Sequence, residues 1–284
     1  MVFSSVLAPL HNVDGADIHG LSLKEGWLEP PVQSHFSPTG TPLVHSFRLE
    51  PAFTHRDLFI DYSYLSGEEG DEQEIEVELE WALTRRLGLV FELPYVLMEP
   101  SGGKAVEGFG DLALSPRFLL AGQGKFILSF NLEIETTTGT NRQGIGNDEA
   151  ALKPSLSTWI GLGERWAFNS QIGVGRTLQT WESELLFRAS IVYTPGNAGS
   201  RHHHEPGEVD GHQHLGKGQL GLIFELDGAV DFAGEEKGDA QVAGIAGVYF
   251  GLGEKMGMRA GYIFPLSSPH DDDHGLTIGV IWHY

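Results

Sequence analysis

Apolar and polar residues alternate along most of this chain with a period of two. The clearest run is residues 74–81 (EIEVELEW), in which every glutamate is followed by an apolar residue. In a β-strand, successive side chains point to opposite sides, so this run would have one apolar and one acidic face. An α-helix would scatter both sets around its circumference. The run therefore predicts a strand that separates an apolar environment from a polar one.

Segments with the same alternation recur about every 12 to 20 residues, separated by clusters of Gly, Asn, Asp or Pro. Short links such as 122–124 and 251–254 alternate with long polar links such as 99–107 and 267–275. This rhythm is typical of barrels with short periplasmic turns and long external loops, whereas a soluble β-sandwich, the alternative, does not require it. The clearest segments lie near residues 74–81, 87–95, 112–118, 126–134, 166–174, 185–193, 220–226, 258–264 and 276–284.

The predicted fold is all-β, a transmembrane up-and-down antiparallel β-barrel of about 12 strands in a bacterial outer membrane. We expect the barrel to occupy residues 43–284. Residues 1–42 do not alternate and contain five prolines, so we interpret them as an irregular N-terminal segment, either a periplasmic arm or a plug. Many apolar faces end in aromatic residues, which suits two interfacial girdles. These residues are Trp81, Tyr95, Trp166, Tyr193, Tyr249, Tyr262, Trp282 and Tyr284.

The composition of the chain argues against several classes of protein and of binding site. Hydrophobic residues make up 40% of the chain and the mean hydropathy is -0.14, which excludes a bundle of membrane helices but suits a wall that faces lipid on one side only. The net charge of -21 argues against nucleic acid as a partner and favours cations. There is no cysteine, so thiolate metal sites are excluded. The first ten residues lack a basic region, and no signal peptide is visible in this chain.

Two motifs carry a family resemblance. Residues 108–118 (GFGDLALSPRF) resemble the glycine-x-glycine-aspartate strand opening of an outer-membrane transporter-like β-barrel family of the meta-pathway phenol-degradation type. The last strand, which ends in Trp282, His283 and Tyr284, is similar to the assembly signal of outer-membrane proteins. The resemblance covers about residues 43–284 and implies a barrel without specifying a substrate. It implies no catalytic residues, and no Ser–His pairing follows from spacing, so no enzymatic activity is expected.

The polar strand faces would line the lumen of such a barrel, and they carry more carboxylates than cations. A lumen lined in this way would prefer cations, which predicts a conduit for small solutes. The alternative is a closed structural or metal-binding barrel without a through-pore, in which the interior charges pair with one another. The candidate lumen residues are Glu74, Glu76, Glu78, Glu80, Glu92, Asp111, Arg117, Glu133, Glu135 and Glu225.

Two histidine-rich segments are candidate metal sites, because imidazole and carboxylate groups bind zinc, copper or nickel. Strand parity places residues 195–218 on the periplasmic side and residues 269–274 outside the cell. The candidate ligands are His202, His203, His204, His212, His214, His270 and His274. An ordinary hydrated loop is the alternative for each segment. Outer-membrane lipid and lipopolysaccharide are the expected partners, the latter through a divalent ion held by the external loop.

Overall fold

The computed structural model describes residues 25–284, except residues 33, 38, 69, 141–144, 196–216, 235–236 and 268–273. The described residues form β-strands and connections, and they include no helix long and apolar enough to cross a membrane. The strands are β1 (Arg56–Gly67), β2 (Gly70–Ala82), β3 (Leu87–Pro100), β4 (Val106–Phe109), β5 (Ala113–Gln123), β6 (Phe126–Glu135), β7 (Ala151–Gly161), β8 (Trp166–Thr177), β9 (Ser183–Tyr193), β10 (Leu220–Ala233), β11 (Ala240–Gly251), β12 (Met256–Pro265) and β13 (His274–His283).

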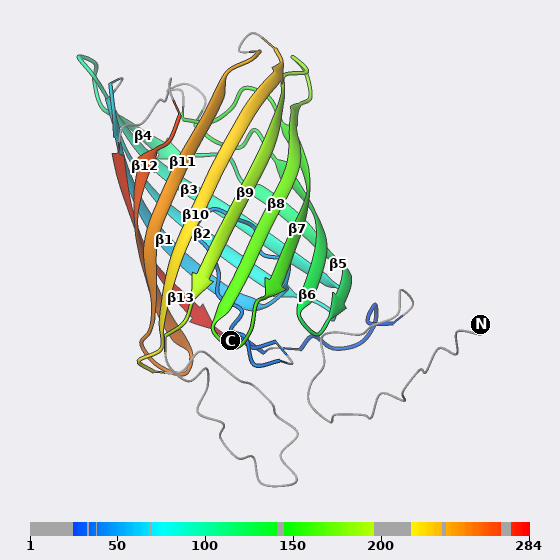
Figure 1. Ribbon diagram of the computed structural model, residues 1–284. Coiled ribbons are helices and arrows are strands. Elements are labelled where there is room, and N and C mark those ends of the chain that lie inside the picture. The colour runs from blue at the N-terminus through cyan, green and yellow to red at the C-terminus, as the bar shows by residue number, and fades with distance from the viewer. Residues whose placement is uncertain are drawn as a thin grey trace, which may run out of the picture.

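Twelve of these strands form a closed antiparallel barrel, as the alternation predicts (Figure 1). Each strand pairs with the next along the chain, and β3 pairs with both β2 and β5. The barrel closes where β1 pairs with β13, in a register that runs from Asp57 opposite His283 to Ser66 opposite His274. The short β4 is an additional strand that pairs with the outer part of β3. The first strand begins at Arg56, later than the barrel boundary expected at residue 43.

Side chains alternate between the outside of the barrel and its interior. In β13, Leu276, Ile278 and Val280 are exposed on the outer face, whereas Thr277 and Ile281 are buried inside. Such an apolar outer face belongs in lipid, because the lipid-facing residues of an outer-membrane barrel form an apolar band. Aromatic side chains lie at the edge of this band, where the rings of Trp166 and Tyr193 are 4.5 Å apart. The girdle prediction was wrong for Tyr249, because its side chain is buried inside the barrel.

The two ends of the barrel differ in their connections. The links β2–β3, β5–β6, β7–β8 and β11–β12 are short and lie at the end where β13 finishes. In outer-membrane barrels this is the periplasmic end. The connection between β9 and β10 leaves from the same end, and the connection between β12 and β13 leaves from the opposite one (Figure 1). The two histidine-rich segments therefore join strands at opposite mouths.

A charge placed in the outer band should destabilise the barrel. We expect Ile278→Arg, in the middle of β13, to lower the free energy of unfolding by about 2–4 kcal/mol, because the guanidinium would face hydrocarbon. Leu162→Arg, in the exposed β7–β8 turn, is the matched control and should change it by less than about 0.5 kcal/mol. Urea titration of the protein in lipid vesicles measures both. Equal effects of the two substitutions would contradict the assignment of the outer face.

Candidate functional site in the barrel lumen

Residues 34–55, called the plug below, lie inside the periplasmic part of the lumen (Figure 1). The chain turns back on itself there, since Ser37 and Leu43 donate backbone hydrogen bonds to the carbonyls of Thr41 and His35. Residues 43–55 belong to the plug although the alternating pattern suggested that they begin the barrel. The part of the chain that enters the lumen therefore extends beyond residue 42.

Apolar contacts hold one side of the plug against the wall. The plug contributes Phe36, Leu43, Val44, Ala52 and Phe53 to a buried cluster. The wall contributes inward side chains near its periplasmic rim, so the plug packs against most of the circumference. These wall residues are Phe59, Leu119, Ile127, Trp159, Ala167, Val192, Ile223, Tyr249 and Ile281.

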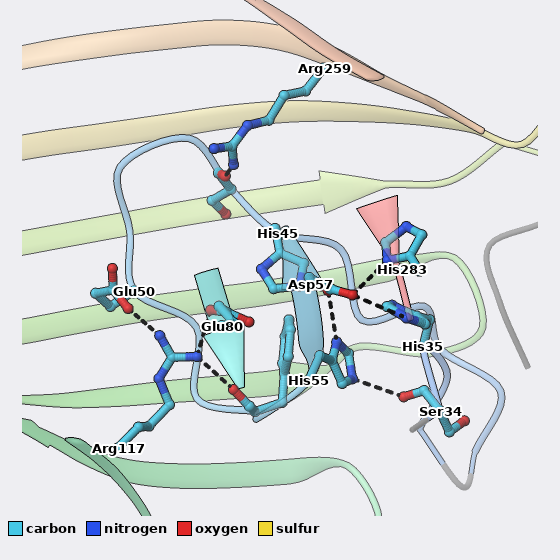
Figure 2. A network of polar contacts seen from close by, with 12 residues as sticks. Ser34, His35, His45, Glu50, His55, Asp57, Glu80, Arg117, Arg259 and His283 are labelled. Carbon is cyan, nitrogen blue, oxygen red and sulfur yellow. Dashed lines mark hydrogen bonds and ion pairs between the residues drawn. The ribbon is translucent and has the colours of Figure 1, made fainter. Parts of the chain in front are cut away.

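Arg117 of β5 fastens the plug by buried charged hydrogen bonds (Figure 2). Its Nη1 atom donates to Glu80 Oε1 of β2 at 2.8 Å and to the carbonyl oxygen of Phe53 at 2.9 Å. Its Nη2 atom donates to the carboxylate of Glu50 in the plug. The Nε atom donates to Asn131 Oδ1 of β6 at 3.0 Å. One guanidinium thus joins the plug to three strands.

A second set of polar contacts holds the segment around residue 47. Glu225 of β10 accepts hydrogen bonds from the backbone N–H groups of Phe47 and Arg48, at 2.7 and 2.9 Å. Arg259 of β12 donates to the carbonyl oxygen of Ser46, and its other nitrogens bind Asp61 of β1 at 2.7 and 2.9 Å. Arg259 and Asp61 thus form an ion pair, and Glu225 is satisfied by backbone N–H groups of the plug.

Above the plug lies a cavity of about 360 Å³, lined by residues 45–51 of the plug and by the inner faces of the wall. Glu74, Glu76 and Glu78 of β2 and Glu92 of β3 border it. Within the described part of the chain, none of these four carboxylates forms an ion pair with a cation. Lys153 across the cavity pairs instead with Glu133 and Glu135, at 3.2 and 2.8 Å. Carboxyl groups therefore outnumber cationic groups around this cavity.

The structure brings the predicted lumen residues to the interior but gives them different environments. Glu74, Glu76, Glu78, Glu92 and Glu133 border the cavity, whereas Glu80, Arg117 and Glu225 are buried in contacts with the plug or wall. Asp111 lies farther toward the external end, where it accepts hydrogen bonds from the backbone N–H groups of Gly139 and Asn147. Glu135 accepts a hydrogen bond from the Asn147 side chain.

Four histidines surround Asp57 at the periplasmic floor of the cavity (Figure 2). His35, His45 and His55 come from the plug, and His283 comes from β13 at the closing seam of the barrel. All five residues are at most 5% exposed. His283 Nδ1 is hydrogen-bonded to Asp57 Oδ1 at 2.8 Å, and His45 Nε2 lies 3.2 Å from Asp57 Oδ2.

Burial favours the neutral form of His35 and His55, the two histidines that lie too far from Asp57 to form hydrogen bonds with it. His55 Nδ1 lies 3.7 Å from Asp57 Oδ2, and His35 Nε2 lies 4.0 Å from Asp57 Oδ1. Burial lowers the pKa of His55 to about 3, despite the opposing effect of Asp57. Burial and the neighbouring His55 imidazole lower the pKa of His35 as well. Neutral imidazole is the form that binds metal ions, so this centre has suitable donors.

Of the predicted histidine ligands, His274 lies in the described part of the chain, and it is not part of this centre. His202, His203, His204, His212, His214 and His270 lie outside the described residues. His274 begins β13 at the external mouth, where it is exposed and its Nδ1 is 2.8 Å from the hydroxyl of Tyr262.

Sequence reasoning missed the centre around Asp57, although two signals for it exist in the sequence. His35, His45 and His55 recur at intervals of ten residues, and Asp57 follows His55 two positions later. Alternation also puts Asp57 and His283 on the inner face at the two ends that meet.

Comparison with known proteins places the fold. No family model and no curated protein matches the sequence. An outer membrane channel from Pseudomonas putida F1 has a similar structure, with a TM-score of 0.59 and 13% identity over 85% of this chain and 100% of that one. The porin NanC is similar with a TM-score of 0.52 and 7% identity, over 80% of this chain and 100% of that one. The fold is that of bacterial outer-membrane β-barrels, which agrees with the predicted location in the outer membrane. The resemblance to phenol-degradation barrels stays a prediction.

The plug contacts predict a large effect for Arg117. Arg117→Met leaves Glu80 and Glu50 without their cation in a buried setting, which should cost about 3–5 kcal/mol in the free energy of unfolding. Lys153→Met also removes a cation that pairs with two glutamates, but its side chain is 25% exposed, and the expected cost is about 0–1 kcal/mol. Urea unfolding in lipid vesicles, followed by tryptophan fluorescence, compares the two variants. A cost for Arg117→Met as small as that for Lys153→Met would rule out this anchoring role.

Proposed function

We propose that this protein is an outer-membrane conduit for small solutes, with a cation-preferring lumen that the plug controls from the periplasmic side. The observation that carries the proposal is the cavity above the plug, where four wall glutamates face water-accessible space without a paired cation among the described residues. The electric field of clustered carboxylates is concentrated in a channel with low-dielectric walls, and this field attracts cations. The likeness in fold to proteins described as an outer membrane channel and a porin supports the same function.

The width of the barrel also supports a conduit. Side chains alone just fill a barrel of about eight strands, and twelve strands enclose more space. Here a separate piece of chain fills the periplasmic part, and polar contacts supply much of its attachment. Displacement of the plug would break contacts with the wall without breaking any wall hydrogen bond between strands. The plug can therefore act as a gate while the barrel stays closed.

A cross-link tests whether plug movement opens the passage. Ser46 Oγ of the plug and Ser190 Oγ of β9 are 2.6 Å apart and buried, and the natural chain has no cysteine. Ser46→Cys with Ser190→Cys should therefore form a disulfide on oxidation, because the separation suits its geometry. Single-channel recording in lipid bilayers is expected to show stepwise conductance under reducing conditions and its loss after oxidation.

The same protein before and after reduction is its own control, and Ser46→Cys alone controls for effects of the oxidant. Conductance that survives the cross-link would contradict plug gating and leave a path past the docked plug. A folded barrel with no conductance in either state would contradict the conduit and favour a closed barrel.

Charge removal tests the cation preference. The triple variant Glu76→Gln, Glu78→Gln and Glu92→Gln removes three unpaired charges from the cavity wall while keeping side-chain volume. In a salt gradient, its reversal potential should move from the cation side toward zero. Glu254→Gln, in the exposed periplasmic turn between β11 and β12, is the matched control and should leave the potential unchanged. An unchanged potential in the triple variant would disprove the assigned role of these glutamates.

A further inference from the structure

In the centre around Asp57, a nitrogen of His55 and an oxygen of Asp57 face each other without a hydrogen bond between them. His55 Nε2 is 3.1 Å from the carbonyl oxygen of Ser34, and a carbonyl only accepts hydrogen bonds. His55 Nε2 therefore carries a proton, and the tautomer with its one proton on Nε2 has a lone pair on Nδ1. That atom points toward Asp57 Oδ2 at 3.7 Å, and a carboxylate oxygen is also an acceptor (Figure 2). Two buried acceptors that face each other repel unless a cation lies between them.

His45 completes the arrangement. Its Nε2 atom lies 3.2 Å from the same oxygen of Asp57, but the two atoms are not aligned as a hydrogen bond. Among the residues that the structure describes, His45 Nε2, His55 Nδ1 and Asp57 Oδ2 are buried atoms without a hydrogen-bond partner. One nitrogen from each of the two histidines and one carboxylate oxygen of Asp57 lie within 4.8 Å of one another. Three potential metal-ligand atoms therefore face one small space, and none of them has a hydrogen-bond partner among the described residues.

From this geometry we propose that His45 Nε2, His55 Nδ1 and Asp57 Oδ2 form a binding site for one divalent transition-metal ion of the zinc, copper or nickel class. Zinc binds imidazole nitrogen and carboxylate oxygen at about 2.0–2.1 Å, so neighbouring ligands of a tetrahedral site are about 3.3 Å apart. The separations of 3.2 and 3.7 Å from Asp57 Oδ2 are close to that value. Three protein ligands leave a fourth position open on the metal.

The surrounding residues orient the ligands as metal sites require. The Ser34 carbonyl fixes the tautomer of His55, and His283 Nδ1 holds the other oxygen of Asp57 at 2.8 Å. The ring of His45 packs edge-on against Phe53 and Phe59, which restricts its rotation. His35 lies over His55 and His283, with ring centroids 4.2 Å from each. These contacts set the ring directions before any ion arrives.

The position of the site determines what the ion would do. Two ligands belong to the plug, and Asp57 belongs to β1 beside the seam with β13. A bound ion would tie the plug to the wall at the periplasmic floor of the cavity. The site stands on its own geometry and does not depend on whether the barrel conducts.

Titration of the chelator-treated protein in detergent with zinc tests the proposal. The histidines between β9 and β10 could also bind zinc, so the titration uses a background variant that lacks them. Its substitutions are His202→Ala, His203→Ala, His204→Ala, His212→Ala and His214→Ala. We expect this protein to bind one zinc ion by calorimetry. Adding His45→Gln and His55→Gln should weaken binding by about 100-fold or more, because two ligands are lost. Adding His274→Gln, an exposed histidine at the other mouth, should change nothing.

A heat-modifiability gel shows whether the double variant folds. If it does not, cobalt spectroscopy of the background variant still tests the proposal. Cobalt(II) in a tetrahedral site absorbs visible light far more strongly than the hydrated ion, so the background variant with an intact triad should show an intense visible band. Zinc should then displace the cobalt and remove the band. The proposal is overturned if the background variant binds no zinc, if binding survives His45→Gln with His55→Gln at full strength, or if cobalt keeps the spectrum of its hydrated form.

Discussion

Every backbone N–H and C=O group that faces lipid must find a hydrogen-bond partner within the protein, and this constraint shapes the whole molecule. A sheet in lipid has a partner for every backbone group only when its first and last strands pair. Here β1 pairs with β13, starting with Asp57 opposite His283. Closure with twelve strands encloses more space than side chains can fill. The N-terminal part of the chain occupies the periplasmic portion of that space. The plug is therefore a consequence of the size at which the sheet closes.

Attachment of the plug combines two kinds of interaction with different consequences. The apolar cluster around Phe53 and Trp159 excludes water at the periplasmic rim. The charged contacts of Arg117, Arg259 and Glu225 fix where the backbone of the plug lies, because each binds a backbone group of that segment. Buried ion pairs add little net stability over apolar packing, but they specify one arrangement when every partner is satisfied. These contacts therefore give the plug one defined position in the lumen.

The sequence predicted the wall far better than the interior. Alternation in runs such as residues 74–81 identified the strands, their outer faces and the closed barrel, because each strand must separate lipid from water. It assigned Glu76 and Arg117 to inner strand faces but could not say which charges pair, since pairing depends on the register between strands and on the plug. The predicted barrel included residues 43–55 because a plug packed in a lumen, like a strand, buries apolar side chains. His35, His45, His55 and Asp57 are close in the sequence, but alternation does not show that the plug folds against β1 and β13, where His283 lies.

Hydrogen–deuterium exchange of the protein in lipid vesicles tests most directly the central claim that residues 34–55 are docked inside the lumen. Backbone amides in the plug that bind partners, such as those of Leu43, Phe47 and Arg48, should exchange nearly as slowly as amides of the barrel strands. Exchange of these amides at the rate of an unstructured peptide, while the strands remain protected, would contradict the account.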